Sequence, residues 1–408
     1  MAEKIRSGIK ELARESALYP LESPLKIREG KKSLQIGVPI ETSLQENRVT
    51  LKPEAVNLLV NNGHEVWVET GAGEAANFKD NAYSEAGAKI VYDRKEIYQS
   101  EIILKVEPPT KYEMDMIRQG VTLISAIQPG TQSVEFLKAI TQKKITALGY
   151  EFIEDKVGGL PLVRAMSEIA GSTVMMIAGE YLSKTRDGQG IILGGVTGVP
   201  PTQVVIVGAG TVAEYATRAA LGLGVDVQVF DNQIYKLRRL KHAVGQQVYT
   251  STIDPTTLEK AIRTADVVIG AVRGEKSTNK VVVSEQMVAQ MKPGSVIIDV
   301  SIDQGGCIET SSPTTLKSPV FKKHDVIHYC VPNIASRVAR TATIAISNIF
   351  SPILLQIADA GGVEEMMFSH SWFTKGVYAY KGSLTNLHLA RKYNMGYKDL
   401  SLLMAARF

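Results

Sequence analysis

The stretch that decides the fold reads Val204-Val205-Ile206-Val207-Gly208-Ala209-Gly210-Thr211-Val212-Ala213. Its first four residues form a β-branched run, which is typical of a buried parallel strand. A helical pattern with small apolar residues on one side follows the glycines. A second β-branched run over 225–230 then ends in Asp231. Strand, glycine loop, helix, second strand and acid follow one another in the order of a dinucleotide-binding βαβ unit.

Each residue of the glycine loop has a physical role in gripping a dinucleotide. Gly208 permits the tight turn, and Gly210 lets the backbone approach the pyrophosphate. Ala213 is small enough for close packing of the helix on the strand. The pyrophosphate would lie on the amides of Thr211, Val212 and Ala213, at the positive end of the helix dipole.

Asp231 indicates which dinucleotide is bound. Its carboxylate would accept hydrogen bonds from the adenosine ribose and would repel a 2′-phosphate, so the motif predicts NAD rather than NADP. The alternative is a βαβ unit whose glycines make a turn and bind no phosphate. The complete order of elements favours the NAD interpretation.

Composition excludes several classes of partner. The net charge is only +4, from 46 basic and 42 acidic residues, so neither a nucleic acid nor a membrane surface is predicted as a partner. The two cysteines, Cys307 and Cys330, indicate a reducing compartment, and no Cys/His spacing suggests a metal site. Residues 1–33 lack the apolar core of a secretory signal, and we expect a cytoplasmic protein.

The rest of the chain alternates predicted strands and helices, which indicates parallel sheets. We expect an N-terminal helical extension over 1–33. We expect a first domain over 34–160 plus 341–408, and a second, NAD-binding domain over 161–340. Long apolar helices over 161–185 and 341–358 would connect them. The predicted fold is therefore α/β, with two Rossmann-like, doubly wound parallel-sheet domains that flank a cleft and are joined by two long helices.

Several further segments, in order along the chain, resemble the alanine dehydrogenases and, beyond them, the soluble nucleotide-binding part of the proton-translocating transhydrogenases. They are Ile36-Gly37-Val38-Pro39, Glu46-Asn47-Arg48-Val49, Gly71-Ala72-Gly73, Met166-Ser167-Glu168-Ile169-Ala170-Gly171, Gly194-Gly195-Val196-Thr197-Gly198-Val199, Ile302-Asp303-Gln304-Gly305-Gly306-Cys307 and His328-Tyr329-Cys330-Val331-Pro332-Asn333. The resemblance implies reversible, NAD-linked oxidative deamination of L-alanine to pyruvate and ammonium. It also implies a homo-oligomer, a hexamer for the dehydrogenases or a dimer for the transhydrogenase part.

The resemblance also assigns site residues. Arg48 matches the arginine that binds the carboxylate of the amino acid or 2-oxo acid, and a guanidinium suits that task because it can donate two parallel hydrogen bonds. Asp303 matches an aspartate beside the substrate and the nicotinamide, and Ser167 and Asn333 match residues along the nicotinamide. The alternatives are a solvated arginine and ordinary cap or turn residues.

Two positions depart from the family pattern. Glu107 stands where the family has a substrate-binding lysine, and Gln128 stands where it has a catalytic histidine. Glutamine cannot exchange a proton near neutral pH, and the Glu107 carboxylate would repel the substrate carboxylate unless it is protonated or turned away. Lys105, two residues earlier on the same strand face, is a candidate substitute for the lysine.

These departures leave three functions open. The first is alanine dehydrogenation in a weak or altered form, with Asp303, Gln128 and Glu107 as candidate catalytic residues and with Arg48 and Lys105 as substrate-binding residues. The second is a soluble transhydrogenase-like subunit that passes hydride to a partner's NADP. The third is a sensor that binds NAD without turnover.

Overall fold

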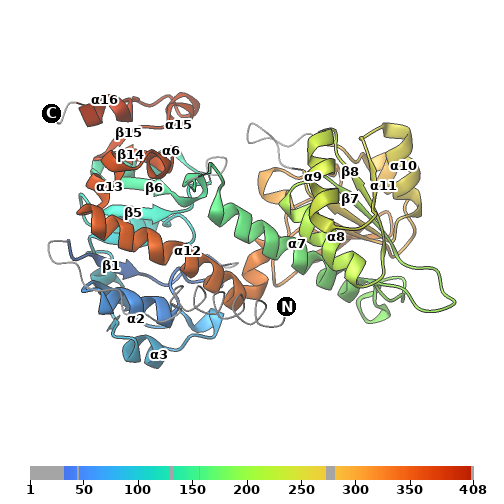
Figure 1. The fold of residues 1–408 in the computed structure, drawn as a ribbon, viewed down its shortest axis with the longest axis horizontal. Coiled ribbons are helices and arrows are strands. Elements are labelled where there is room, and N and C mark those ends of the chain that lie inside the picture. The colour runs from blue at the N-terminus through green and yellow to red at the C-terminus, as the bar shows by residue number, and fades with distance from the viewer. Residues whose placement is uncertain (1–31, 44–45, 129–131, 156, 273–280, 406–408) are drawn as a thin grey trace, which may run out of the picture.

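The computed structural model describes residues 32–43, 46–128, 132–155, 157–272 and 281–405. The helix predicted within the extension 1–33 lies outside these residues. Within them the chain forms two sheets, which lie at opposite ends of the molecule in Figure 1 and are connected by the helices α7 and α12. The predicted α/β class, with two doubly wound sheets joined by two long helices, is confirmed. The cleft between the two domains stays a prediction.

The first sheet has eight strands in the order β15-β14-β6-β5-β4-β1-β2-β3. The strands are β1 (Gln35–Val38), β2 (Glu65–Glu69), β3 (Lys89–Val91), β4 (Ile102–Leu104), β5 (Thr122–Ser125), β6 (Thr146–Gly149), β14 (Val377–Tyr380) and β15 (Ser383–Leu384). β1 to β6 are parallel, whereas β14 pairs antiparallel with both β6 and β15. The C-terminal segment thus returns to the first sheet, and the exact domain boundaries remain a prediction.

The second sheet has seven strands in the order β12-β13-β11-β10-β7-β8-β9. They are β7 (Gln203–Val207), β8 (Asp226–Phe230), β9 (Tyr249–Ser251), β10 (Val267–Gly270), β11 (Val296–Asp299), β12 (Val320–Lys323) and β13 (Val326–Tyr329). Only β12 is antiparallel, and it borders β13 at one edge. Both sheets are therefore mostly parallel, as expected, with antiparallel pairing at one edge of each that was not predicted. Short tight connections, such as His324-Asp325 between β12 and β13, allow antiparallel pairing there without a crossover helix.

The helices cover the faces and ends of these sheets. They are α2 (Pro53–Asn61), α3 (Asp80–Glu85), α4 (Arg94–Ile97), α5 (Lys111–Met116), α6 (Val134–Gln142), α7 (Pro161–Leu182), α8 (Thr211–Gly222), α9 (Ile234–Val244), α10 (Pro255–Thr264), α11 (Glu285–Val288), α12 (Ala339–Ala360), α13 (Val363–Ser369), α14 (Ser371–Thr374), α15 (Leu387–Lys392) and α16 (Leu400–Ala405). Short 3₁₀ turns are η1 (Glu74–Ala76), η2 (Tyr150–Phe152), η3 (Lys184–Arg186), η4 (Ile302–Gln304) and η5 (Ile334–Val338).

The two long helices connect the domains. α7 begins at Pro161, a favoured first helical residue, and runs from the first domain to pack along α8 of the second (Figure 1). α12 packs on α7 and α2 and buries Ile346, Phe350 and Leu354. Among the described residues, the segment Ile334–Ala360 alone is long and apolar enough to span a membrane, yet 56% of its most apolar window is buried in the protein. It is a core helix.

The order of strands indicates where a ligand would bind in each sheet. In the first sheet β1 lies between β2 and β4, and in the second β7 lies between β8 and β10. The connections therefore leave β1 and β4, and likewise β7 and β10, toward opposite faces of their sheets. In doubly wound sheets ligands bind beyond the carboxyl ends of the strands at such a switch point. The loops after β1, β4 and β7 are the expected sites.

Candidate active site

The loop after β1 is held in place by hydroxyl groups of the connecting segment. The backbone amide of Asn47 donates to Ser336 Oγ at 2.8 Å, and the backbone amide of Val49 donates to Thr343 Oγ1 at 3.1 Å. Both hydroxyl residues are buried beside or within α12. These bonds fix the backbone on both sides of Arg48, so the arginine is presented by a rigid loop.

Arg48 is buried and forms a two-pronged ion pair with Glu46. Its Nε lies 2.7 Å from Glu46 Oε1, and its Nη2 lies 2.5 Å from Glu46 Oε2. The side-chain amide of Asn333, in the segment between β13 and α12, donates to the same Glu46 Oε2 at 2.6 Å. The remaining nitrogen, Nη1, lies 3.2 Å from the Met166 sulfur on α7. Arg48 and Glu46 therefore lie where the first domain meets residues of the connecting segment.

Glu107, after β4, is the second carboxylate beside Arg48. Its Oε1 lies 3.7 Å from Arg48 Nη2, and Gln128 Nε2 donates to its Oε2 at 2.6 Å. Burial and the nearby Glu46 carboxylate raise the pKa of Glu107 to about 7, although Arg48 opposes this. The two residues that depart from the family pattern therefore contact each other, and they do so next to the arginine.

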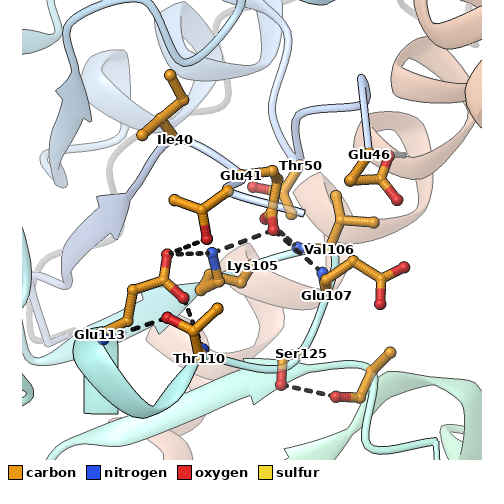
Figure 2. A network of polar contacts seen from close by, with 12 residues as sticks. Ile40, Glu41, Glu46, Thr50, Lys105, Val106, Glu107, Thr110, Glu113 and Ser125 are labelled. Atoms are coloured by element: carbon orange, nitrogen blue, oxygen red, sulfur yellow. Dashed lines mark hydrogen bonds and ion pairs between the residues drawn. The ribbon is translucent and has the colours of Figure 1, made fainter. Parts of the chain in front are cut away.

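Lys105 faces away from this group. Its Nζ lies 3.1 Å from Glu41 Oε2 and 3.2 Å from Glu113 Oε1, and Figure 2 shows it between these two carboxylates, with the Glu107 side chain directed elsewhere. Only 1% of Lys105 is exposed. Burial acts to lower the pKa of Lys105, but the two carboxylates outweigh it and raise that pKa. This geometry supports a structural role, and substrate binding by Lys105 stays a prediction that the geometry does not favour.

The glycine loop after β7 has the shape that a dinucleotide needs. Gly208 has φ of 110°, and a Cβ there would lie 2.4 Å from the Ala271 carbonyl oxygen, so both conformation and space demand glycine. A Cβ on Gly210 would meet no atom within 4 Å, which leaves the space in front of its backbone open. No side chain caps the N-terminus of α8, where Thr211 and Val212 begin the helix and Ala213 is fully buried against the core. These residues fit a pyrophosphate.

Asp231 stabilises the same loop. Its Oδ2 accepts from the Ala209 amide at 2.8 Å, and its Oδ1 accepts from the Gln233 amide at 2.7 Å. Each oxygen retains acceptor capacity for a ribose hydroxyl. Arg239 Nη2, from α9, lies 3.4 Å from the Ala209 carbonyl oxygen, which places a cation close to this acid. The sequence interpretation did not include this arginine.

The other predicted site residues are spread around these loops. Ser167 is half-buried on α7, next to the methionine that contacts Arg48. Asn333 has a left-handed backbone, with φ of 59°, and bonds to Glu46. Asp303 is exposed in η4, which follows β11. The structure thus brings together Arg48, Glu107, Gln128 and Asn333, whereas contact of Ser167 or Asp303 with a ligand stays a prediction.

The sequence interpretation gave no role to two residues of the site. Glu46 holds Arg48 and meets Asn333, and its position two residues before the arginine was the available signal. Tyr150 is half-buried near Arg48, and its hydroxyl donates to the Val106 carbonyl oxygen at 2.7 Å. Nothing in the sequence near Tyr150 indicated this approach, because it depends on the pairing of distant strands.

Comparisons with known proteins show which family the chain resembles. Residues 37–170 match the family described as "Alanine dehydrogenase/PNT, N-terminal domain", and residues 174–387 match its C-terminal domain. The chain is 40% identical to alanine dehydrogenase of Bacillus subtilis (strain 168), over 89% of this chain and 95% of that protein. It is 38% identical to alanine dehydrogenase 2 of Staphylococcus aureus (strain USA300), over 90% and 98%.

Solved structures give the same result. An L-alanine dehydrogenase superposes with a TM-score of 0.83 at 35% identity, covering 88% of this chain and 99% of that one. A transhydrogenase from Sinorhizobium meliloti superposes with a TM-score of 0.74 over 86% and 99%, and at 22% identity it shows the shared fold alone. The chain therefore belongs to the alanine dehydrogenase/PNT family.

Proposed function

We propose that this chain is an NAD-dependent amino-acid dehydrogenase that converts L-alanine to pyruvate and ammonium, reversibly. The observation that carries the proposal is the hydrogen-bonded series Asn333–Glu46–Arg48, which joins a residue expected beside the nicotinamide to the arginine expected to bind the substrate carboxylate. An amino acid held by Arg48 would therefore have its C2 near the coenzyme. Bound NAD supplies the chemistry of accepting a hydride from that carbon.

The contacts of Arg48 indicate how it would hold the substrate. Two of its nitrogens are occupied by Glu46, which fixes the plane of the guanidinium. The third, Nη1, contacts only a weak acceptor, the Met166 sulfur, among the hydrogen bonds of the described residues. A substrate carboxylate would replace that sulfur as acceptor. Glu107 near the same guanidinium opposes a second anion, so we expect weaker binding of the substrate carboxylate where Glu107 is ionised.

Steady-state NADH formation tests the proposed reaction. L-alanine should produce NADH faster than the other members of a panel of amino acids, and pyruvate with ammonium should consume it. A chain that binds NADH but turns over no member of the panel would rule out the dehydrogenase and favour a sensor. Hydride transfer from NADH only to an NADP analogue on a partner would favour the transhydrogenase-like function.

The two glycines offer a matched test of the coenzyme site. Gly210→Ala should leave the melting temperature near that of the wild-type chain but weaken NADH binding, because its Cβ enters only the space reserved for the pyrophosphate. Gly208→Ala should lower stability as well, because its Cβ meets the Ala271 carbonyl. Wild-type NADH affinity in Gly210→Ala would show that the pyrophosphate lies elsewhere.

Asp231 provides the test of coenzyme choice. NADH should bind at least about tenfold more tightly than NADPH, a difference of about 1.4 kcal/mol. Asp231→Ala should reduce the difference between the two affinities by strengthening NADPH binding. Arg239 would then lie near the 2′-phosphate of NADPH without a competing carboxylate. Equal affinities of the wild-type chain for NADH and NADPH would show that Asp231 does not select the coenzyme. We further expect the protein to be cytoplasmic and to act as a homo-oligomer, hexameric or dimeric.

A further inference from the structure

The contact between Glu107 and Gln128 has a chemical consequence. Gln128 has replaced the family's histidine, and an amide cannot gain or lose a proton near neutral pH. Its Nε2 instead donates to Glu107 Oε2 at 2.6 Å, which directs a carboxyl group toward the position from which the histidine would act. The Glu107 side chain is 19% exposed, so it is the partly accessible carboxyl beside Arg48, whereas the Glu46 side chain is fully covered.

We propose that Glu107 is the catalytic residue that exchanges the proton in this site, and that Gln128 is its positioning residue. The inference rests on the proposed dehydrogenase function and names the group that performs its acid–base step. The roles of two family positions are thereby exchanged. Glu107, at the position of the substrate-binding lysine, exchanges the proton, and Gln128, at the position of the catalytic histidine, orients Glu107.

The groups that face Glu107 explain why it can hold a proton. The carboxylates of Glu46 and Glu41 and the Arg48 guanidinium act on Glu107, and the half-buried Tyr150 also lies near it. Two carboxylates beside one guanidinium cannot both ionise freely, so a neutral Glu107 can donate a hydrogen bond to Glu46. Burial and this repulsion bring the pKa of Glu107 to about 7, where a group serves equally well as acid and as base.

Gln128 is itself held rigidly. Its backbone has φ of 46°, a left-handed conformation that is uncommon outside glycine, and its backbone amide donates to Glu151 Oε1 at 2.8 Å. The Ile127 amide donates to the same carboxylate oxygen at 2.8 Å. The Glu151 carboxylate thus fixes the backbone from which Gln128 reaches Glu107, as a residue that orients a catalytic group requires.

Glu107 would exchange its proton with the water that adds to the substrate carbon. After hydride has left C2 of the amino acid, water attacks that carbon of the iminium, a C–O bond forms, and the C=N π pair moves to nitrogen. The Glu107 carboxylate takes one proton from the attacking water and becomes neutral, which leaves a neutral carbinolamine. In the reverse direction the neutral Glu107 returns this proton to the hydroxyl as the C–O bond breaks and water leaves.

Pyruvate binding tests the proposal without turnover. Pyruvate, in the absence of ammonium, is titrated into the protein saturated with NADH, between about pH 6 and 8.5, by NADH fluorescence. Its carboxylate should bind with neutral Glu107, so affinity should fall about tenfold for each pH unit above about 7. Glu107→Gln should bind equally well at every pH, and Glu135→Gln, which removes an exposed carboxylate on α6, should behave as the wild type.

Kinetics test the role in the reaction. Glu107→Gln should lower kcat by about 100-fold or more, with a smaller change in KM. Gln128→Ala should lower turnover and shift the pH profile of kcat. Gln128→His should restore the turnover that is lost in Gln128→Ala. Wild-type kcat in Glu107→Gln, or pyruvate affinity independent of pH in the wild-type chain, would overturn the proposal. Absence of NADH formation from every amino acid would remove the proposed function instead, and the pyruvate titration would then decide alone whether Glu107 exchanges a proton.

Discussion

Among the described residues of the first domain, Arg48 and Lys105 are buried cations that each lie beside two glutamates, and the difference between them separates structure from function. Lys105 lies 3.1 Å from Glu41 and 3.2 Å from Glu113, and its side chain and both carboxylates are no more than 5% exposed. We call these three residues the lysine triad. Its charges are enclosed, and Figure 2 shows its polar atoms directed at one another.

Arg48 with Glu46 and Glu107 forms the arginine triad, which is asymmetric. Arg48 lies 2.5 Å from Glu46 but 3.7 Å from Glu107, and the Glu107 side chain is 19% exposed. One carboxylate holds the guanidinium, and the other contacts Gln128 and is partly exposed. The comparison suggests that a buried cation marks a site where one of its carboxylate partners lies farther from it and is partly exposed.

The largest expected effect comes from breaking the lysine triad. Lys105→Met keeps the length of the side chain but leaves two buried carboxylates without a cation, which should lower the free energy of unfolding by about 3–5 kcal/mol. Urea unfolding followed by tryptophan fluorescence suits the measurement, because Trp67 in β2 and Trp372 in α14 both lie in the first domain. A loss of less than about 1 kcal/mol would mean that Lys105 is available for other contacts.

A smaller effect of opposite sign is expected in the arginine triad. The pKa of Glu107 rises from 4.5 to about 7 on folding, so the folded chain binds its proton more tightly. The wild type should therefore lose stability relative to Glu107→Gln as pH rises from about 4.5 to 7, by on the order of 1–3 kcal/mol. Below about pH 4.5 the two should unfold alike. A wild-type chain that is more stable than Glu107→Gln at pH 8 would refute this.

The smallest effect tests whether the lysine triad is separate from the arginine triad. Thr42 Oγ1 lies 3.1 Å from Glu113 Oε1 and completes the bonding of that carboxylate. Thr42→Val should cost about 0.5–1.5 kcal/mol in urea unfolding and leave the pH dependence of NADH formation unchanged. A shifted pH profile would show that the two triads are coupled.

Much of the fold could be predicted from local sequence. The β-branched run, glycines and acid of the stretch Val204–Asp231 specify one βαβ unit, and apolar runs located the inner parallel strands, but the parallel edge strands β3 and β9 were not predicted. The antiparallel strands β12, β14 and β15 were missed because their pairing depends on where distant segments return to the sheet edges. Edge strands carry weak local signals.

The site was predictable as a set of residues but not as a set of contacts. Arg48, Glu107 and Gln128 were identified by their places in the motifs, and the structure brings them together. Lys105 points at Glu113 because α5 places that carboxylate beside it, and the sequence does not show this contact. Likewise, the roles of Glu46 and Tyr150 depend on contacts between loops far apart in the chain.

The central claim is that Glu107 carries one exchangeable proton near neutral pH. Burial also raises the pKa of Glu41, so the signal of Glu107 must be isolated. Infrared difference spectra of the carboxyl C=O stretch, recorded from about pH 5 to 9 for the wild type and for Glu107→Gln, do this. We predict one carboxylic acid band that disappears with a midpoint near pH 7 in the wild type and is missing in Glu107→Gln. Identical spectra of the two proteins across this range would contradict the account.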